Sequence, residues 1–269
     1  MLNRIVLSSG TGQMSADILR KYRSLELMDV VLMSDFGLLE VLGTLPCLAN
    51  LTLEASDPAS HPAHAPENSN SKSGGRKNFD ALESVSIMGS FILIQHLIDS
   101  SCLNSIKVYE GINRVRDEHE QEPEDLLTPS IMIVASKWSQ SLKNLAIISS
   151  SAHRYTLSKC LMLLTDLHEM HTFHLYGWRM GNMDDNVRRL VMSWPKLRAL
   201  SLLPSNRTFI SLSTLRVIAE TCPELHYLHI PLDISTIPPI DTFSKSLLAG
   251  MSNPSGTIFA FNLPLSEIH

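Results

Sequence analysis

The segment "HEMHTFH" (residues 168–174) holds three histidines and a glutamate, which are residue types that bind zinc. A metalloprotease helix carries H-E-x-x-H, which sets its two histidines one helical turn apart. Here the order is H-E-x-H, and His171 and His174 are three apart in a stretch that we expect to enter a strand. Side chains three apart in a strand point to opposite faces. We therefore expect no metal here and interpret these histidines as loop and surface residues.

A second candidate for chemistry is the glycine-rich turn in "IVLSSGTGQMSADIL" (residues 5–19). A strand-like stretch, Gly10-x-Gly12 and a helix-like stretch follow in the order that a phosphate-binding loop requires. However, Ser15 stands where the dinucleotide pattern needs a third glycine, and there is no lysine for a P-loop. A nucleotide-binding α/β enzyme using this turn is the alternative hypothesis. No other motif offers a place for catalysis, so we expect a non-enzyme without a cofactor.

Composition narrows the classes of partner. The chain has 269 residues, of which 44% are hydrophobic and 18% charged, so it can bury a sizeable core. Its formal net charge is −5, with no run of Lys and Arg, which disfavours a nucleic-acid partner. The four cysteines form no C-x-x-C pair, as is typical of an intracellular protein, cytoplasmic or nuclear. No apolar stretch reaches the roughly 20 residues of a membrane helix, so we expect no membrane partner.

The elements that would position these residues follow from a repeated pattern, L-x-x-L-x-L. We call its first apolar residue the anchor. The anchors are Tyr22, Leu48, Leu82, Leu103, Leu142, Met170, Leu197 and Leu225, and a further copy, "LNRIVL", lies at the N-terminus. Successive anchors are separated by 26, 34, 21, 39, 28, 27 and 28 residues. Five of these seven spacings fall within the roughly 20–29 residues of leucine-rich repeats.

Amphipathic stretches precede several of the copies and predict helices. They span residues 90–100, 156–167, 183–194 and 211–222. Strand, loop, helix and strand at this spacing predict an α/β leucine-rich-repeat solenoid over residues 1–232, with a curved parallel sheet and helices on its convex side. We expect a disordered insertion at 55–78, a polar loop at 111–126 and an irregular tail or cap at 233–269.

Such a sheet would expose one row of side chains per strand on its concave face, where a protein substrate or partner could bind. Small polar residues predominate in the centre of the row, whereas histidines and tyrosines gather in its C-terminal half. Tyrosine is favoured at binding hot spots. The candidate partner-binding residues are Lys107, Tyr109, His174, Tyr176, Ser201, Tyr227 and His229.

Two copies of the repeat carry a further feature. In "WPKLRALSL" and "CPELHYLHI" a Trp-Pro or Cys-Pro closes the helix before the strand. These segments resemble the repeats of F-box/leucine-rich-repeat proteins, and residues 136–180 resemble the divergent repeats of fungal F-box-like proteins. The resemblance implies the substrate-binding part of a ubiquitin-ligase subunit. No F-box precedes the repeats in this sequence, so the family's adaptor recruitment carries over to no residue here.

Overall fold

The computed structural model describes residues 5–8, 22–30, 42, 45–55, 79, 81–89, 103, 106–113, 127–149, 158–233 and 258–262. Several expectations lie outside these residues: the Gly10-x-Gly12 turn, the helix at 90–100, and most of the insertion, of the polar loop and of the C-terminal tail. The chain is an α/β protein that divides into two compact units, Met1–Leu142 (unit 1) and Lys143–His269 (unit 2).

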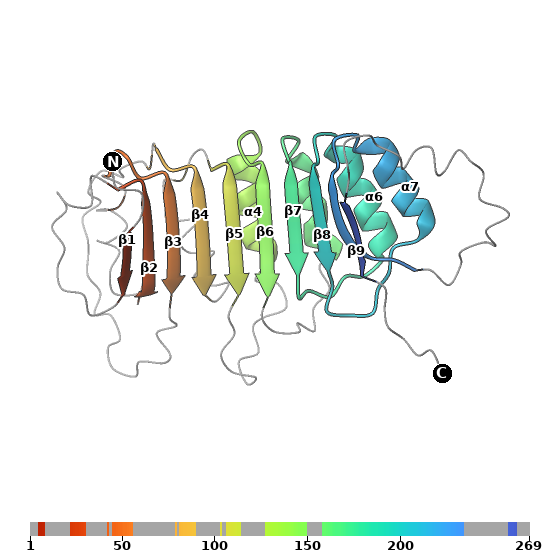
Figure 1. Cartoon of the computed structure of the whole chain (residues 1–269), viewed down its shortest axis with the longest axis horizontal. Helices are drawn as coiled ribbons and strands as arrows, with labels where there is room; N and C mark the ends of the chain where they lie inside the picture. Colours follow the sequence, from red (N-terminus) through yellow and green to blue (C-terminus); the bar gives the residue numbers. More distant parts are fainter. Residues whose placement is uncertain are drawn as a thin grey trace. The chain divides into compact units, whose positions relative to one another are not determined.

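Unit 1 contains five described strands and one described helix. They are β1 (Ile5–Ser8), β2 (Ser24–Val30), β3 (Asn50–Ala55), β4 (Ser84–Gly89), β5 (Val108–Asn113) and α4 (Leu127–Trp138). Each of these strands pairs with the next one in parallel (Figure 1). The pairing of Ile5 with Leu25 and of Leu7 with Leu27 confirms the register that we expected for the N-terminal copy.

Unit 2 repeats this arrangement of parallel strands and contains more of the described helices. Its elements are β6 (Asn144–Ser149), α5 (Ser158–Leu161), the 3-10 helix η2 (Met162–Asp166), β7 (Thr172–Tyr176), α6 (Met183–Ser193), β8 (Ala199–Leu203), α7 (Leu212–Thr221), β9 (Tyr227–Pro231) and β10 (Ile258–Asn262). The five strands are again parallel and in sequence order (Figure 1). The helices expected at 183–194 and 211–222 are confirmed, whereas the one expected at 156–167 is a short α-helix followed by a 3-10 turn.

One backbone contact recurs at the start of successive strands. The carbonyl oxygen of the residue after an anchor accepts two backbone hydrogen bonds from the next copy. The donors are the N–H groups of the two residues that follow the next anchor. Arg23 O accepts from Ala49 and Asn50, at 2.8 and 3.0 Å. The other carbonyls that accept in this way are those of Ala49, Glu83, Lys143, His171 and Arg198. This contact defines the register of each copy independently of its side chains.

The side chains of the strands alternate between two environments, as the pleat requires. The inward pairs are buried: Leu51 and Leu53, Val85 and Ile87, Leu145 and Ile147, Phe173 and Leu175, Leu200 and Leu202, Leu228 and Ile230.

Aromatic and thiol groups at helix ends contact the copy that comes before. Trp194, which ends α6, packs on Phe173 and donates from Nε1 to Leu164 O at 3.1 Å. The helices therefore cover the inward side.

The register of β5 differs from the one that we expected, so two site assignments were wrong. Val85 pairs with Tyr109 and Ile87 with Gly111, which makes Tyr109 and Gly111 the inward pair. Tyr109 is 4% exposed and packs on Trp138, with ring centroids 5.4 Å apart. It therefore belongs to the core and not to the concave face.

The second wrong assignment is Lys107, which lies before β5 rather than between an inward pair. Its backbone N–H donates to Glu83 O, the contact made by the residue after each anchor. The anchor of this copy is therefore Ile106 and not Leu103. The outward residue of β5 is Glu110, whose Oε2 accepts a hydrogen bond from Ser86 Oγ at 3.0 Å. Sequence reasoning missed Glu110 because the second inward residue of this copy is a glycine.

The strand pattern also continues beyond residue 232. Phe259 and Phe261 of β10 pair with Leu228 and Ile230 of β9, in the register that the earlier copies use. We expected the repeats to end at residue 232, with an irregular tail or cap at 233–269, whereas β10 adds one more parallel strand in the same register. This copy lacks the sequence pattern because Gly256 stands where the anchor leucine would be.

Candidate binding face

The outward face of unit 2 is formed by alternate residues of β6 to β9, on the side opposite the helices. Three outward residues come from each strand: Asn144, Ala146, Ile148; Thr172, His174, Tyr176; Ala199, Ser201, Leu203; and Tyr227, His229, Pro231. None of these twelve is Asp, Glu, Lys or Arg. The face is therefore neutral apart from its two histidines, and it carries two tyrosines.

Tyr176 and His174 form one aromatic pair on this face. Their rings are stacked, with centroids 5.9 Å apart and planes at 11°. The Tyr176 hydroxyl donates to Ser201 Oγ on the neighbouring strand at 2.9 Å and lies 3.4 Å from His174 Nδ1. Tyr176 is thus held at both its ring and its hydroxyl.

Ser201 lies beneath this pair rather than at the surface. It is fully buried, at 0% exposed, although the pleat directs it outward. Its hydroxyl accepts the Tyr176 hydrogen bond. The expectation that Ser201 contacts a partner was therefore wrong, because a side chain without exposed surface cannot touch one.

Tyr227 and His229 of β9 form the second aromatic pair, with an edge-on geometry and centroids 6.5 Å apart. The register places Ser201 beside His174 on one side and beside His229 on the other. Neighbouring strands are about 4.8 Å apart, so the two histidines flank Ser201 with about 9.6 Å between their strands. The structure therefore brings four of the seven predicted residues together: His174, Tyr176, Tyr227 and His229.

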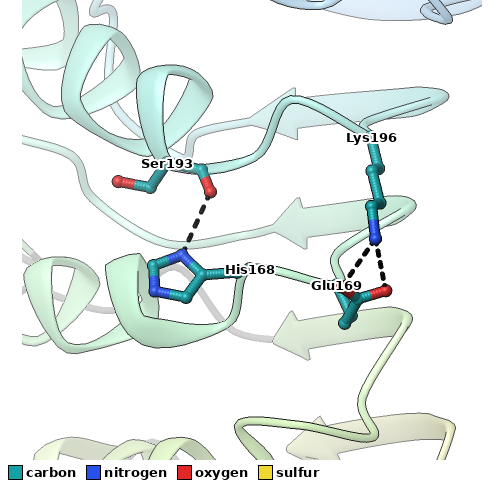
Figure 2. Close-up of polar contacts among 4 residues, drawn as sticks. All are labelled: His168, Glu169, Ser193 and Lys196. Carbon is teal, nitrogen blue, oxygen red and sulfur yellow. Dashed lines mark hydrogen bonds and ion pairs between the residues drawn. The ribbon is translucent and has the colours of Figure 1, made fainter.

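The segment "HEMHTFH" does not converge on a single point. His168 donates from Nδ1 toward Ser193 O at 3.5 Å, whereas Glu169 forms an ion pair with Lys196 at 2.6 Å (Figure 2). The hydrogen bond from Lys196 lowers the pKa of the Glu169 carboxyl, so this group stays ionised. Among the described residues, no group of three His, Cys, Asp or Glu side chains is arranged to hold a metal ion.

His171 lies at the entry to β7, on the edge where the strands begin. Burial lowers its pKa, and the positive charges of Arg198 and Lys143 lower it further. The same edge carries an exposed ion pair between Arg198 and Glu224, at 2.8 Å. In unit 1, Lys107 and Glu83, which directly precede β5 and β4, form a similar exposed pair at 2.6 Å. Solvent screens exposed pairs of this kind, so they orient side chains more than they stabilise the fold.

No protein-family model and no curated protein matches this chain. Within the described part of the chain, none of the helices combines the length and the apolar character needed to span a membrane.

Proposed function

We propose that the chain is a leucine-rich-repeat solenoid that acts as a non-catalytic protein-recognition module. Three features support the solenoid. In each unit the described strands pair in parallel and in sequence order. The same double backbone contact begins one strand after another. The inward side chains pack toward helices, which leaves the opposite face of the strands to present side chains.

The observation that carries the recognition function is the neutral outward face of unit 2. It presents two tyrosine–histidine pairs, and Tyr176 is held in place by a stack and a hydrogen bond. Tyrosines give a large contact area for a small loss of conformational entropy, which is why they are common at hot spots. We infer that a protein partner binds across His174, Tyr176, Tyr227 and His229.

The resemblance of the Trp-Pro and Cys-Pro repeats to F-box/leucine-rich-repeat proteins suggests what such a partner would be. In that family the repeats hold the substrate of an SCF-type ubiquitin ligase. On this hypothesis the partner is an intracellular protein marked for ubiquitination, and the outward face of unit 2 selects it.

The alternative, a nucleotide-binding enzyme that uses the turn at Gly10 and Gly12, receives less support. A dinucleotide-binding sheet reverses its strand order at a switch point, and its first strand has neighbours on both sides. Among the described strands β1 pairs with β2 alone, and β2 pairs next with β3. We therefore favour the recognition module.

The test places a photo-crosslinking amino acid at one position on the proposed face and at one position away from it. His229 is the face position. Met192 of α6, which is 68% exposed, is the control on the helical side. Crosslinking in cells from residue 229 should capture a protein that is not captured from residue 192.

The same experiment is then repeated with Tyr176→Ala and Tyr227→Ala combined. Truncating hot-spot residues weakens binding by roughly thirtyfold or more, so capture from residue 229 should be lost. Both tyrosines are half-exposed, so the melting temperature should change little. Equal capture from both positions, or capture that survives the double substitution, would place recognition elsewhere on the chain.

A further inference from the structure

We propose that Ser201 is a positioning residue for partner binding: its buried hydroxyl holds the ring of Tyr176 in the orientation that the partner meets. The inference rests on the proposed function. It gives Ser201 a role in binding although Ser201 does not touch the partner. Ser201 has no exposed surface, so it can influence a partner only through the groups that cover it.

In the sheet, Tyr176 pairs with Leu203, and Ser201 pairs with His174. If the Tyr176 side chain extended perpendicular to the sheet, it would lie beside the side chain of Leu203. Instead, its hydroxyl reaches Ser201, two residues nearer the start of the neighbouring strand, and donates at 2.9 Å. The ring is therefore tilted along the strand.

The tilt also produces the stack with His174. The two residues are separated by one position on β7, so their side chains leave the same face of the strand. Tilting the Tyr176 ring toward Ser201 brings it parallel to the imidazole, at 11° and 5.9 Å. The hydroxyl–hydroxyl bond thus holds the Tyr176 ring stacked against the His174 ring, and both residues are half-exposed.

Holding the rings before the partner arrives should increase affinity. A side chain that must be immobilised on binding loses conformational entropy, and one that is already fixed does not. Without the Ser201 hydroxyl the Tyr176 ring can leave the stack. The expected loss of affinity is roughly threefold to tenfold, the range that one immobilised side chain accounts for.

The test uses short peptides selected from a random display library on the full-length chain at neutral pH. We keep only the peptides whose binding weakens at least about tenfold with Tyr227→Ala. Dependence on Tyr227 indicates that a peptide binds at the proposed face. Their dissociation constants are then measured for the wild type, Ser201→Ala, Tyr176→Phe and the combination of both. Ser86→Ala is the matched control, because Ser86 occupies the corresponding outward position of β4 and bonds to Glu110.

The two single substitutions remove opposite ends of the same hydrogen bond. Each should therefore weaken binding by roughly threefold to tenfold, and the combination should weaken it no further than either alone. Ser86→Ala should leave binding unchanged. Losses that multiply in the combination, or no loss with Ser201→Ala, would overturn the positioning role.

A second readout does not depend on a ligand. The chain has five tyrosines, so a sample with ring-labelled tyrosine gives a simple NMR spectrum in which Tyr176→Phe identifies the signal of residue 176. Ser201→Ala should move that signal toward the value of a free tyrosine without lowering the melting temperature. An unmoved signal would contradict the inference. If no selected peptide responds to Tyr227→Ala, the proposed binding face is wrong and this inference is wrong with it.

Discussion

The inward pair of β5 allows a decisive test of the register, because Tyr109 and Gly111 share one space. A Cβ atom added at Gly111 would lie 2.8 Å from the Tyr109 hydroxyl oxygen, closer than carbon and oxygen pack. On the neighbouring strand the same two positions hold Val85 and Ile87. The phenol ring of Tyr109 therefore fills the volume that the second aliphatic side chain fills in β4.

Each single substitution toward the β4 pair should destabilise the chain, and the two together should compensate. Gly111→Ile overfills the space and should lower the free energy of unfolding by about 1–3 kcal/mol. Tyr109→Val leaves a cavity beside Trp138 and should lower it by about 2–4 kcal/mol. The combination recreates Val-x-Ile, so its loss should fall short of the sum by about 1–3 kcal/mol.

The assay is equilibrium unfolding in urea, followed by circular dichroism, with Val108→Ala as the control. Val108 is half-exposed, so its truncation should cost less than about 1 kcal/mol. The register that we first expected makes the opposite claim, with Val108 inward and Tyr109 outward. A cost below about 0.5 kcal/mol for Tyr109→Val, or strict additivity in the double variant, would refute the register of the structure.

Three further predictions concern unit 2. Gly177 has φ +77°, and a Cβ there would lie 2.3 Å from Ser149 O, so Gly177→Ala should lower the melting temperature sharply. Trp194→Phe removes the fused pyrrole ring and its Nε1 donor to Leu164 O, which still accepts from Leu167 N, and should cost about 1–3 kcal/mol in urea unfolding. The lowered pKa of His171 means that the unfolded state binds more protons below about pH 6.5, so stability should rise with pH through that range. Urea titrations at several pH values should show a shallower rise for His171→Gln.

The parts of the fold that could be predicted are those that depend on large apolar side chains. Leu200 and Leu202, like Leu228 and Ile230, are inward because a Leu-x-Leu pattern in a strand puts both residues on one face. Their anchors, Leu197 and Leu225, come two residues after the proline of a Trp-Pro or Cys-Pro that ends a helix. Strand, helix and register are all determined locally in these copies, so sequence reasoning placed them correctly.

Sequence reasoning failed where a glycine replaced an apolar residue of the pattern. In β5, Gly111 takes the second inward position because Tyr109 fills both volumes, so the pattern L-x-x-L-x-L fits "LNSIKV", three residues before the true register. In β10 the missing residue is the anchor itself. A pattern of residue types records which side chains are large, whereas a core requires only that the volume be filled.

The outward face poses a different problem, since its residues are free of that packing requirement. Each inward pair has to fill the same space, so inward residues stay aliphatic or aromatic from one copy to the next. Outward residues vary from Ala146 to His174 to Ser201 along a single row. The sequence therefore indicates which residues point outward but not how they orient, because the tilt of Tyr176 depends on an acceptor from another strand. If this face recognises a protein, the information that selects the partner lies in such contacts between neighbouring copies.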